Sequence, residues 1–190
     1  MAALGAWRTL KMGDRAAAII FGDEETAYVP ALRSRATVHR ICSELVRMNH
    51  KLDVGSEADD PGALNHALLQ AAGLAKHDWL VTLVTDCHGA DPETQKLVTR
   101  IAQHNDMLAA LVYDQLGIQL PAVEGLEVTD GRTRTRLPPE AGFRRRYEEA
   151  FVARSRLIRD RFSALEIPVL PICTHDPVVD QVLSALGHRP

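Results

Sequence analysis

The chain has 190 residues, of which 46% are hydrophobic and 25% are charged, and its formal net charge is −3. This composition is that of one ordinary globular domain, and the slightly acidic balance argues against nucleic acid or an anionic membrane as a partner. The three cysteines are widely spaced, which predicts free thiols in a cytoplasmic protein. No apolar run reaches the roughly eighteen residues that span a bilayer.

The first half of the chain shows helical and strand-like hydrophobic spacing in turn. It predicts a helix at 1–12, an antiparallel hairpin of strands at 16–21 and 26–29 lying at a sheet edge, a helix at 35–49, an acidic loop at 52–61 and a helix that ends near Ala75.

The stretch from Trp79 to Asp91 organises the rest of the chain. Residues 80–84 form a short apolar run rich in β-branched side chains, which is typical of a strand buried on both faces in a parallel sheet. Polar residues and a glycine follow it. Since ligands of open α/β sheets bind at the carboxyl ends of strands, we expect any chemistry near Asp86.

The second half continues the alternation of strands and helices. It predicts a helix beginning at Asp91-Pro92, a strand at 107–113, a small hairpin over Asp130-Gly131, a long helix at 140–165, an edge strand with two prolines at 167–173 and a helix at 176–186. The expected fold is α/β and Rossmann-like, with a mostly parallel sheet, helices on both faces and a single domain over residues 1–190.

Several sequence stretches resemble one bacterial family. They include GDRAAAIIFGDE at 13–24, the segment 61–87 that ends in WLVTLVTDC, YDQLGIQLP at 113–121 and the final strand followed by T-x-D and a helix. The chain is similar to the carboxyl-terminal part of domain-of-unknown-function family 58. Members of that family carry a von Willebrand factor A-like domain and are commonly encoded beside MoxR-type AAA+ ATPases.

The resemblance implies a metal site with three parts: D-x-S-x-S after the first strand, a threonine before a later helix and an aspartate after the next strand. Asp86 matches the aspartate. Gly62 stands near the threonine position, and the first part is absent. Mg²⁺ or Mn²⁺ needs several oxygen ligands, so the resemblance implies a degenerate site without a cofactor unless the missing ligands are supplied.

The strand that would carry D-x-S-x-S belongs mid-sheet in the von Willebrand A arrangement, between strands 16–21 and 80–84. Leaving its place empty would strand backbone polar groups in the core. We therefore expect an amino-terminally truncated chain or a misassigned start. The alternatives are that the two strands close up or that another molecule supplies a strand.

Other groups allow different chemistry. Asp86, Asp91 and His175 could ligate a metal in a hydrolase, although D-C-H-G-A-D matches no metal motif and a capping Asp86 with an exposed His88 is the simpler interpretation. Cys87 could be a nucleophile, but a buried, inert thiol is favoured.

Two charged segments are better explained as solvated surfaces. Arg132, Arg134 and Arg136 alternate along a strand and could bind nucleic acid or an acidic partner, but glutamates interleave nearby. The acidic residues of the loop, Asp53, Glu57, Asp59 and Asp60, could attract a cation or a basic partner.

The sequence as a whole favours a non-enzymatic interaction module. The resemblance implies an adaptor for a MoxR-type AAA+ ATPase, with a contact surface formed by Gly62, Asp86, His88 and Asp91. The alternative is the metal-dependent hydrolase.

Overall fold

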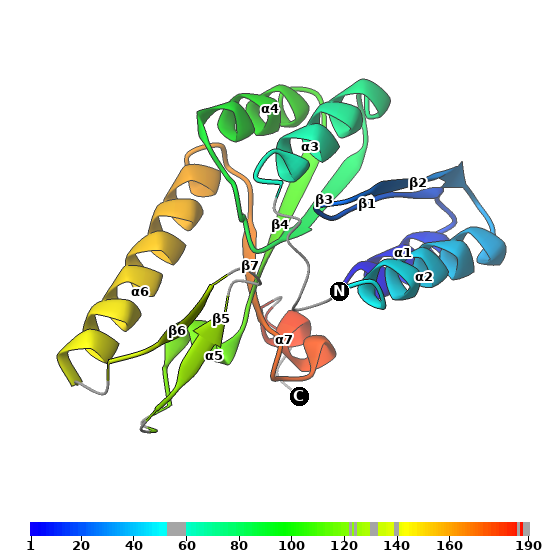
Figure 1. Ribbon diagram of the computed structural model, residues 1–190. Coiled ribbons are helices and arrows are strands. Elements are labelled where there is room, and N and C mark those ends of the chain that lie inside the picture. Colours follow the sequence, from blue (N-terminus) through cyan, green and yellow to red (C-terminus); the bar gives the residue numbers. More distant parts are fainter. Residues whose placement is uncertain are drawn as a thin grey trace. The chain divides into compact units, whose positions relative to one another are not determined.

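A computed structural model describes residues 1–52, 60–121, 123, 125–129, 133–138, 141–185 and 187. The chain divides into two compact units, each made of two segments (Figure 1). The first consists of Met1–Asp78 and His88–His104, and the second of Trp79–Cys87 and Asn105–Pro190. The expectation of one domain over the whole chain stays a prediction. No helix among the described residues is long and apolar enough to cross a membrane.

The described residues of the first unit form the predicted hairpin and four helices. Its elements are α1 (Ala2–Lys11), β1 (Ala16–Phe21), β2 (Thr26–Leu32), α2 (Arg35–Asn49), α3 (Ala63–Leu74) and α4 (Pro92–Ala102). The antiparallel pairing runs from Ala16 opposite Leu32 to Phe21 opposite Thr26, with one irregularity between Ala16 and Ala18, which confirms the hairpin. Val29 and Ile41 are almost fully buried where α2 packs on this hairpin.

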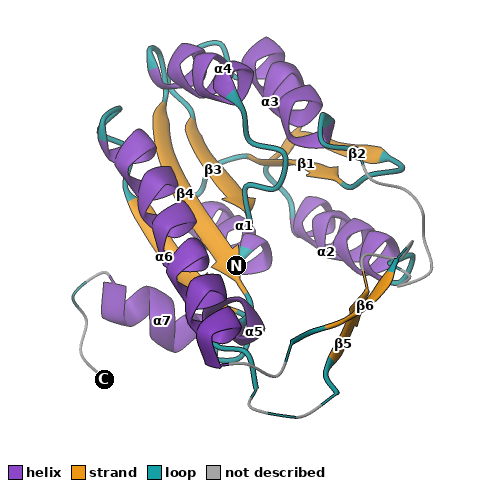
Figure 2. Cartoon of the chain, turned by 60° about the vertical axis from the view of Figure 1, so that its left-hand side comes forward, coloured by secondary structure: helices purple, strands orange, loops and turns teal. Residues whose placement is uncertain are grey.

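The second unit is built on a parallel sheet. Its elements are β3 (Leu80–Thr85), β4 (Asp106–Tyr113), α5 (Gln115–Ile118), β5 (Glu127–Thr129), β6 (Arg134–Arg136), α6 (Ala141–Ser163), β7 (Val169–Cys173) and α7 (Val178–Ala185). The strands lie in the order β3-β4-β7, and both α6 and α7 contact β7 (Figure 2). The predicted α/β fold with a parallel sheet flanked by helices is confirmed.

The structure corrects the prediction that residues 80–84 are buried on both faces. Leu83 is buried, but the Leu80 side chain is 66% exposed and Thr82 is also exposed. Leu80 and Thr82 point to the same face of β3 and Leu83 to the other, so one face of this strand is exposed and the other is buried.

β1 and β2 pair with each other as a two-stranded sheet, and no pairing of either with β3 is found among the described residues. The alternative that strands 16–21 and 80–84 close up stays a prediction. The small hairpin is confirmed as β5 and β6, although Asp130, Gly131 and Arg132 lie outside the described residues. β7, which contains Pro171 and directly follows Pro168, is an edge strand among the described residues, as the two prolines predict.

Candidate functional site at the carboxyl ends of the parallel strands

The carboxyl ends of β4 and β7 are joined by a side-chain hydrogen bond. Tyr113 is paired with Cys173, so Asp114 and Thr174 follow the two strands side by side. The Thr174 hydroxyl donates to Asp114 Oδ2 at 2.7 Å, and the Thr174 backbone N–H donates to the Tyr113 carbonyl at 3.0 Å. Two residues sixty positions apart are thereby fixed at this edge of the sheet.

Asp114 also begins the next helix. Its Oδ1 accepts from the Leu116 backbone N–H at 2.8 Å and caps α5. This N–H, followed by the Thr174 hydroxyl, lowers the pKa of the Asp114 carboxyl below its ordinary value. Sequence reasoning missed Asp114 as a site residue, although the signal that marked Asp86, a carboxylate directly after a predicted strand, applies to it equally.

β3 ends in a tight turn at Asp86 and Cys87. Cys87 adopts the left-handed conformation, with φ of 58°, and its N–H donates to the Thr85 hydroxyl at 3.0 Å. The Arg154 guanidinium of α6 donates to the Cys87 carbonyl at 3.3 Å. The predicted burial of Cys87 is confirmed, because its side chain is only 4% exposed.

The thiol of Cys87 is poorly suited to nucleophilic chemistry. Burial, with a smaller contribution from the negative charge of Asp86, raises its pKa to about 11. The nucleophilic form of a cysteine is the thiolate. At neutral pH this residue therefore carries its proton.

In the first unit, Asp91 serves as the helix cap that the Asp-Pro pair predicts. Its Oδ1 accepts from the Thr94 N–H at 2.9 Å and from the Asn65 amide at 3.1 Å, while the Thr94 hydroxyl donates to Asn65 Oδ1 at 2.7 Å. The Thr94 N–H, and then Asn65, lower the pKa of Asp91. This carboxylate joins the start of α4 to α3 and is engaged in holding that junction.

The predicted site residues divide between the two units. Gly62, His88 and Asp91 belong to the first and Asp86 to the second. The cluster considered for hydrolysis divides in the same way, since Asp91 lies in the first unit and His175 in the second. The structure thus supports two local arrangements, one around Asp91 and one around Asp114.

The described residues do not provide the donor set of a hard cation. Gly62 has no side-chain oxygen, and Asp91 Oδ1 already accepts the hydrogen bonds named above. In the described part of the chain, no three His, Cys, Asp or Glu side chains are grouped so that they could hold a metal ion. Asp53, Glu57 and Asp59 of the acidic loop lie outside that part.

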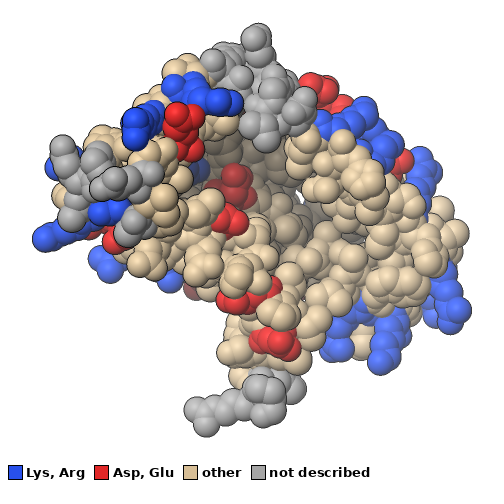
Figure 3. Space-filling model, turned by 60° about the horizontal axis from the view of Figure 1, so that its bottom comes forward, with Lys and Arg blue, Asp and Glu red and all other residues tan. Residues whose placement is uncertain are grey.

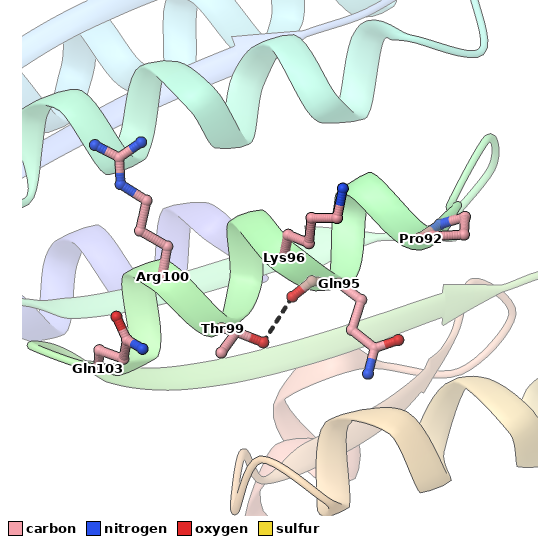
Figure 4. A pocket seen from close by; sticks show the side chains of 6 residues that line it. All are labelled: Pro92, Gln95, Lys96, Thr99, Arg100 and Gln103. Carbon is pink, nitrogen blue, oxygen red and sulfur yellow. Dashed lines mark hydrogen bonds between the residues drawn. The ribbon is translucent and has the colours of Figure 1, made fainter.

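An open hollow lies along α4, lined by Pro92, Gln95, Lys96, Thr99, Arg100 and Gln103. Figure 4 shows the Arg100 and Gln95 side chains pointing away from the helix in different directions rather than toward one point. Lys96 pairs with Glu93 at 2.8 Å, and the Thr99 hydroxyl donates to the Gln95 carbonyl. These residues come from one helix and its C-cap, Gln103, and do not converge on a ligand.

Several basic side chains of the described residues lie close to acidic side chains. On the face drawn in Figure 3, Lys and Arg side chains of the described residues lie in separate groups, with acidic side chains near several of them. Arg145 pairs with Glu149 at 2.8 Å, and Arg134 lies 3.9 Å from Glu127. This pattern is typical of a solvated surface.

Comparison with known proteins places the chain in a family. The model of the family described as "Protein of unknown function DUF58" matches residues 1–157. No curated protein and no solved structure matches the chain. With the family model covering well over half of its length, the chain belongs to the DUF58 family.

Proposed function

We propose that the chain is a non-enzymatic interaction module of the von Willebrand factor A-like kind. The strongest support comes from the hydrogen bonds of two carboxylates. Asp114 directly follows β4, and Asp91 directly precedes α4. Asp114 and Asp91 each cap a helix and bind a side chain of a distant segment. Carboxylates held in this way order the loops around them and offer a fixed surface to a partner.

The proposed partner is a MoxR-type AAA+ ATPase, for which the chain would act as an adaptor. Its support is membership of the family and the association with such ATPases that the sequence resemblance implies. The proposed contact residues are Gly62, His88 and Asp91 in the first unit and Asp86 in the second. The proposed contact is independent of metal, which is supported by the lack of a grouping of three His, Cys, Asp or Glu side chains among the described residues.

The test is equilibrium binding of the purified chain to a purified MoxR-type ATPase from the same genome. We expect Asp86→Arg to weaken binding by about tenfold or more, as charge reversal does in the centre of an interface. Asp160→Arg is the matched control, because it reverses an exposed carboxylate on α6 and should leave the affinity within about twofold. Equal melting temperatures show that both variants are folded.

Failure of the wild-type chain to bind, or equal loss in both variants, would contradict the proposed surface. The hydrolase is the alternative outcome. It requires a phosphoesterase activity with Mn²⁺ that disappears in Asp86→Asn, and a melting temperature that rises with Mn²⁺ through ligand binding to the native state.

A further inference from the structure

The long helix of the second unit carries a concentration of arginine. Helix α6 contacts α5 and β7 of its own unit, so the direction in which its outer side points is fixed within that unit (Figure 1). Its 23 residues include seven arginines, no lysine and three carboxylates. The whole chain, in contrast, has a formal net charge of −3. Positive charge is therefore gathered on this helix.

The side chains that face the sheet show which side of α6 points outward. Phe162 is buried, and the Phe151 ring packs edge-on against Tyr113 of β4, with the ring centroids 6.0 Å apart. Ile158 is half-buried. Residues about half a turn away from these along the helix point away from the sheet.

Five exposed residues form one row along the outer side of α6. They are spaced three or four positions apart, which places them on one side of the helix, and they are Arg146, Ala150, Ala153, Leu157 and Arg161. We call this row the arginine stripe. It has an arginine at each end and three apolar side chains between them, of which Leu157 is 51% exposed. The two arginines lie about 22 Å apart along the helix.

The neighbouring row of the same helix balances its own charge. Arg145 is followed four positions later by Glu149, and their side chains pair at 2.8 Å. Arg156 is likewise followed four positions later by Asp160. Opposite charges at this spacing lie next to each other on a helix. This row therefore has the character of an ordinary solvated surface.

The arginine stripe lacks that local balance. No residue three or four positions from Arg161 is acidic, and Glu149, the carboxylate three positions from Arg146, already pairs with Arg145. A guanidinium group can bind a carboxylate through two parallel N–H groups, which favours arginine over lysine where acidic groups are recognised. The stripe is thus suited to a ligand with a carboxylate at each end.

We propose that the arginine stripe binds an acidic amphipathic helix of a partner protein. The partner would place one carboxylate opposite Arg146 and another opposite Arg161, with aliphatic side chains between them. Ala150 and Ala153 would let the two helices approach closely, because the distance between packed helices depends on the side chains at the contact. Leu157 would pack between side chains of the partner helix.

Other acidic ligands fit the stripe less well. Proteins that bind single-stranded nucleic acid interleave basic with aromatic side chains, and the stripe contains no aromatic residue. A helix that lies on an anionic membrane needs several large apolar side chains, whereas Leu157 is the one large apolar residue of the stripe. An apolar centre between two arginines therefore favours a protein helix.

The first test uses a synthetic helical peptide of about four turns, with glutamates at both ends of a face of alanine and leucine. We expect the chain to bind this peptide, and Arg146→Gln combined with Arg161→Gln to weaken binding by about tenfold or more. The matched control combines Arg156→Gln with Arg159→Gln, which removes the same charge from other sides of α6 and should change the affinity by less than about threefold.

Two outcomes of this measurement would overturn the proposal. One is that the wild-type chain does not bind the peptide, and the other is that both double variants lose affinity equally. A second peptide of the same composition, with its glutamates moved to the opposite side of the helix, should bind much more weakly. The stripe shares no residue with the contact proposed for the ATPase, so either proposal can fail alone.

Thiol labelling tests whether the stripe is open in the whole chain. In a Cys42→Ser background the remaining cysteines are buried, so Leu157→Cys should react quickly with a thiol reagent and more slowly once the peptide is bound. Val152→Cys, at an exposed position outside the stripe, should react at the same rate with and without peptide. Slow labelling of Leu157→Cys without peptide would show that another part of the protein covers the stripe, which would overturn the proposal.

Phosphatidylserine vesicles and single-stranded DNA distinguish the other acidic ligands. We expect the wild-type chain and the variant with Arg146→Gln and Arg161→Gln to behave alike toward both. Vesicle or DNA binding that is lost in this variant, without binding of the peptide, would assign the stripe to a lipid or a nucleic acid and contradict the proposal.

Discussion

The turn after β3 depends on one buried cysteine. Cys87 combines a left-handed backbone, rare for a residue other than glycine, with a side chain that is 4% exposed. Its carbonyl accepts from Arg154, and its N–H is bound by Thr85. The same burial that fixes the turn keeps the thiol protonated, so this residue contributes packing at the end of the strand.

We predict that Cys87 is unreactive in the native chain at slightly alkaline pH. Cys42 is partly exposed, while Cys87 and Cys173 are buried, so a thiol reagent should modify Cys42 first and the other two only on unfolding. In the Cys42→Ser variant, the fast phase of modification by the reagent should be absent. Native Cys87 reacting as fast as Cys42 would contradict the burial of its thiol.

The raised pKa also predicts a pH dependence of stability. The folded chain holds the Cys87 proton more tightly than the unfolded chain, so the stabilising effect is complete below the ordinary pKa of 9.0 and is lost as the pH rises through about 11. The melting temperature of the wild-type chain should therefore fall more steeply over this range than that of Cys87→Ala. Parallel curves for the two proteins would show that burial does not shift the pKa.

At the scale of elements, the junction of α3 and α4 is the best-defined part of the first unit. Asp91, Thr94 and Asn65 form its hydrogen-bonded network. The loop before α4 passes so close to the start of α3 that a Cβ at Gly89 would lie 2.2 Å from the Pro61 carbonyl oxygen. Gly89 also has φ of 69°, where a side chain adds strain.

We predict that Gly89→Ala lowers the free energy of unfolding by about 2 kcal/mol or more, through strain at positive φ and displacement of the Pro61 backbone. Gly73→Ala is the matched control, because Gly73 lies within α3 and a Cβ there meets no atom within 4 Å. Alanine in a helix should stabilise the chain by about 0.5–1 kcal/mol. Urea unfolding measures both changes, and equal effects of the two variants would show that the loop is not packed against Pro61.

For the whole molecule, the elements with clear local patterns could be predicted from the sequence. Helical spacing and an Asp-Pro start marked α4, and the apolar run marked β3. The hairpin of β1 and β2 followed from a turn between two short β-prone runs. These patterns depend on residues close in the chain, which one sequence shows directly.

Features set by distant partners could not be predicted. The exposure of Leu80 depends on what packs against its face of the sheet, and an apolar run has the same appearance whether one face or both are covered. The bond from Thr174 to Asp114 depends on the parallel register of β4 and β7. Asp86 belongs to one compact unit, and Gly62, His88 and Asp91 belong to the other. This assignment also depends on packing, which the spacing of residues in the sequence does not show.

The most direct test of the interaction module is the metal dependence of its binding to the MoxR-type ATPase. The dissociation constant is measured with the wild-type chain in Mg²⁺ and again after chelation, with nucleotide omitted so that the ATPase needs no metal of its own. We expect the two constants to agree within about twofold, since no three His, Cys, Asp or Glu side chains of the described residues are grouped so that they could hold a hard cation. Tight binding that is abolished by the chelator and restored by Mg²⁺ would contradict this account.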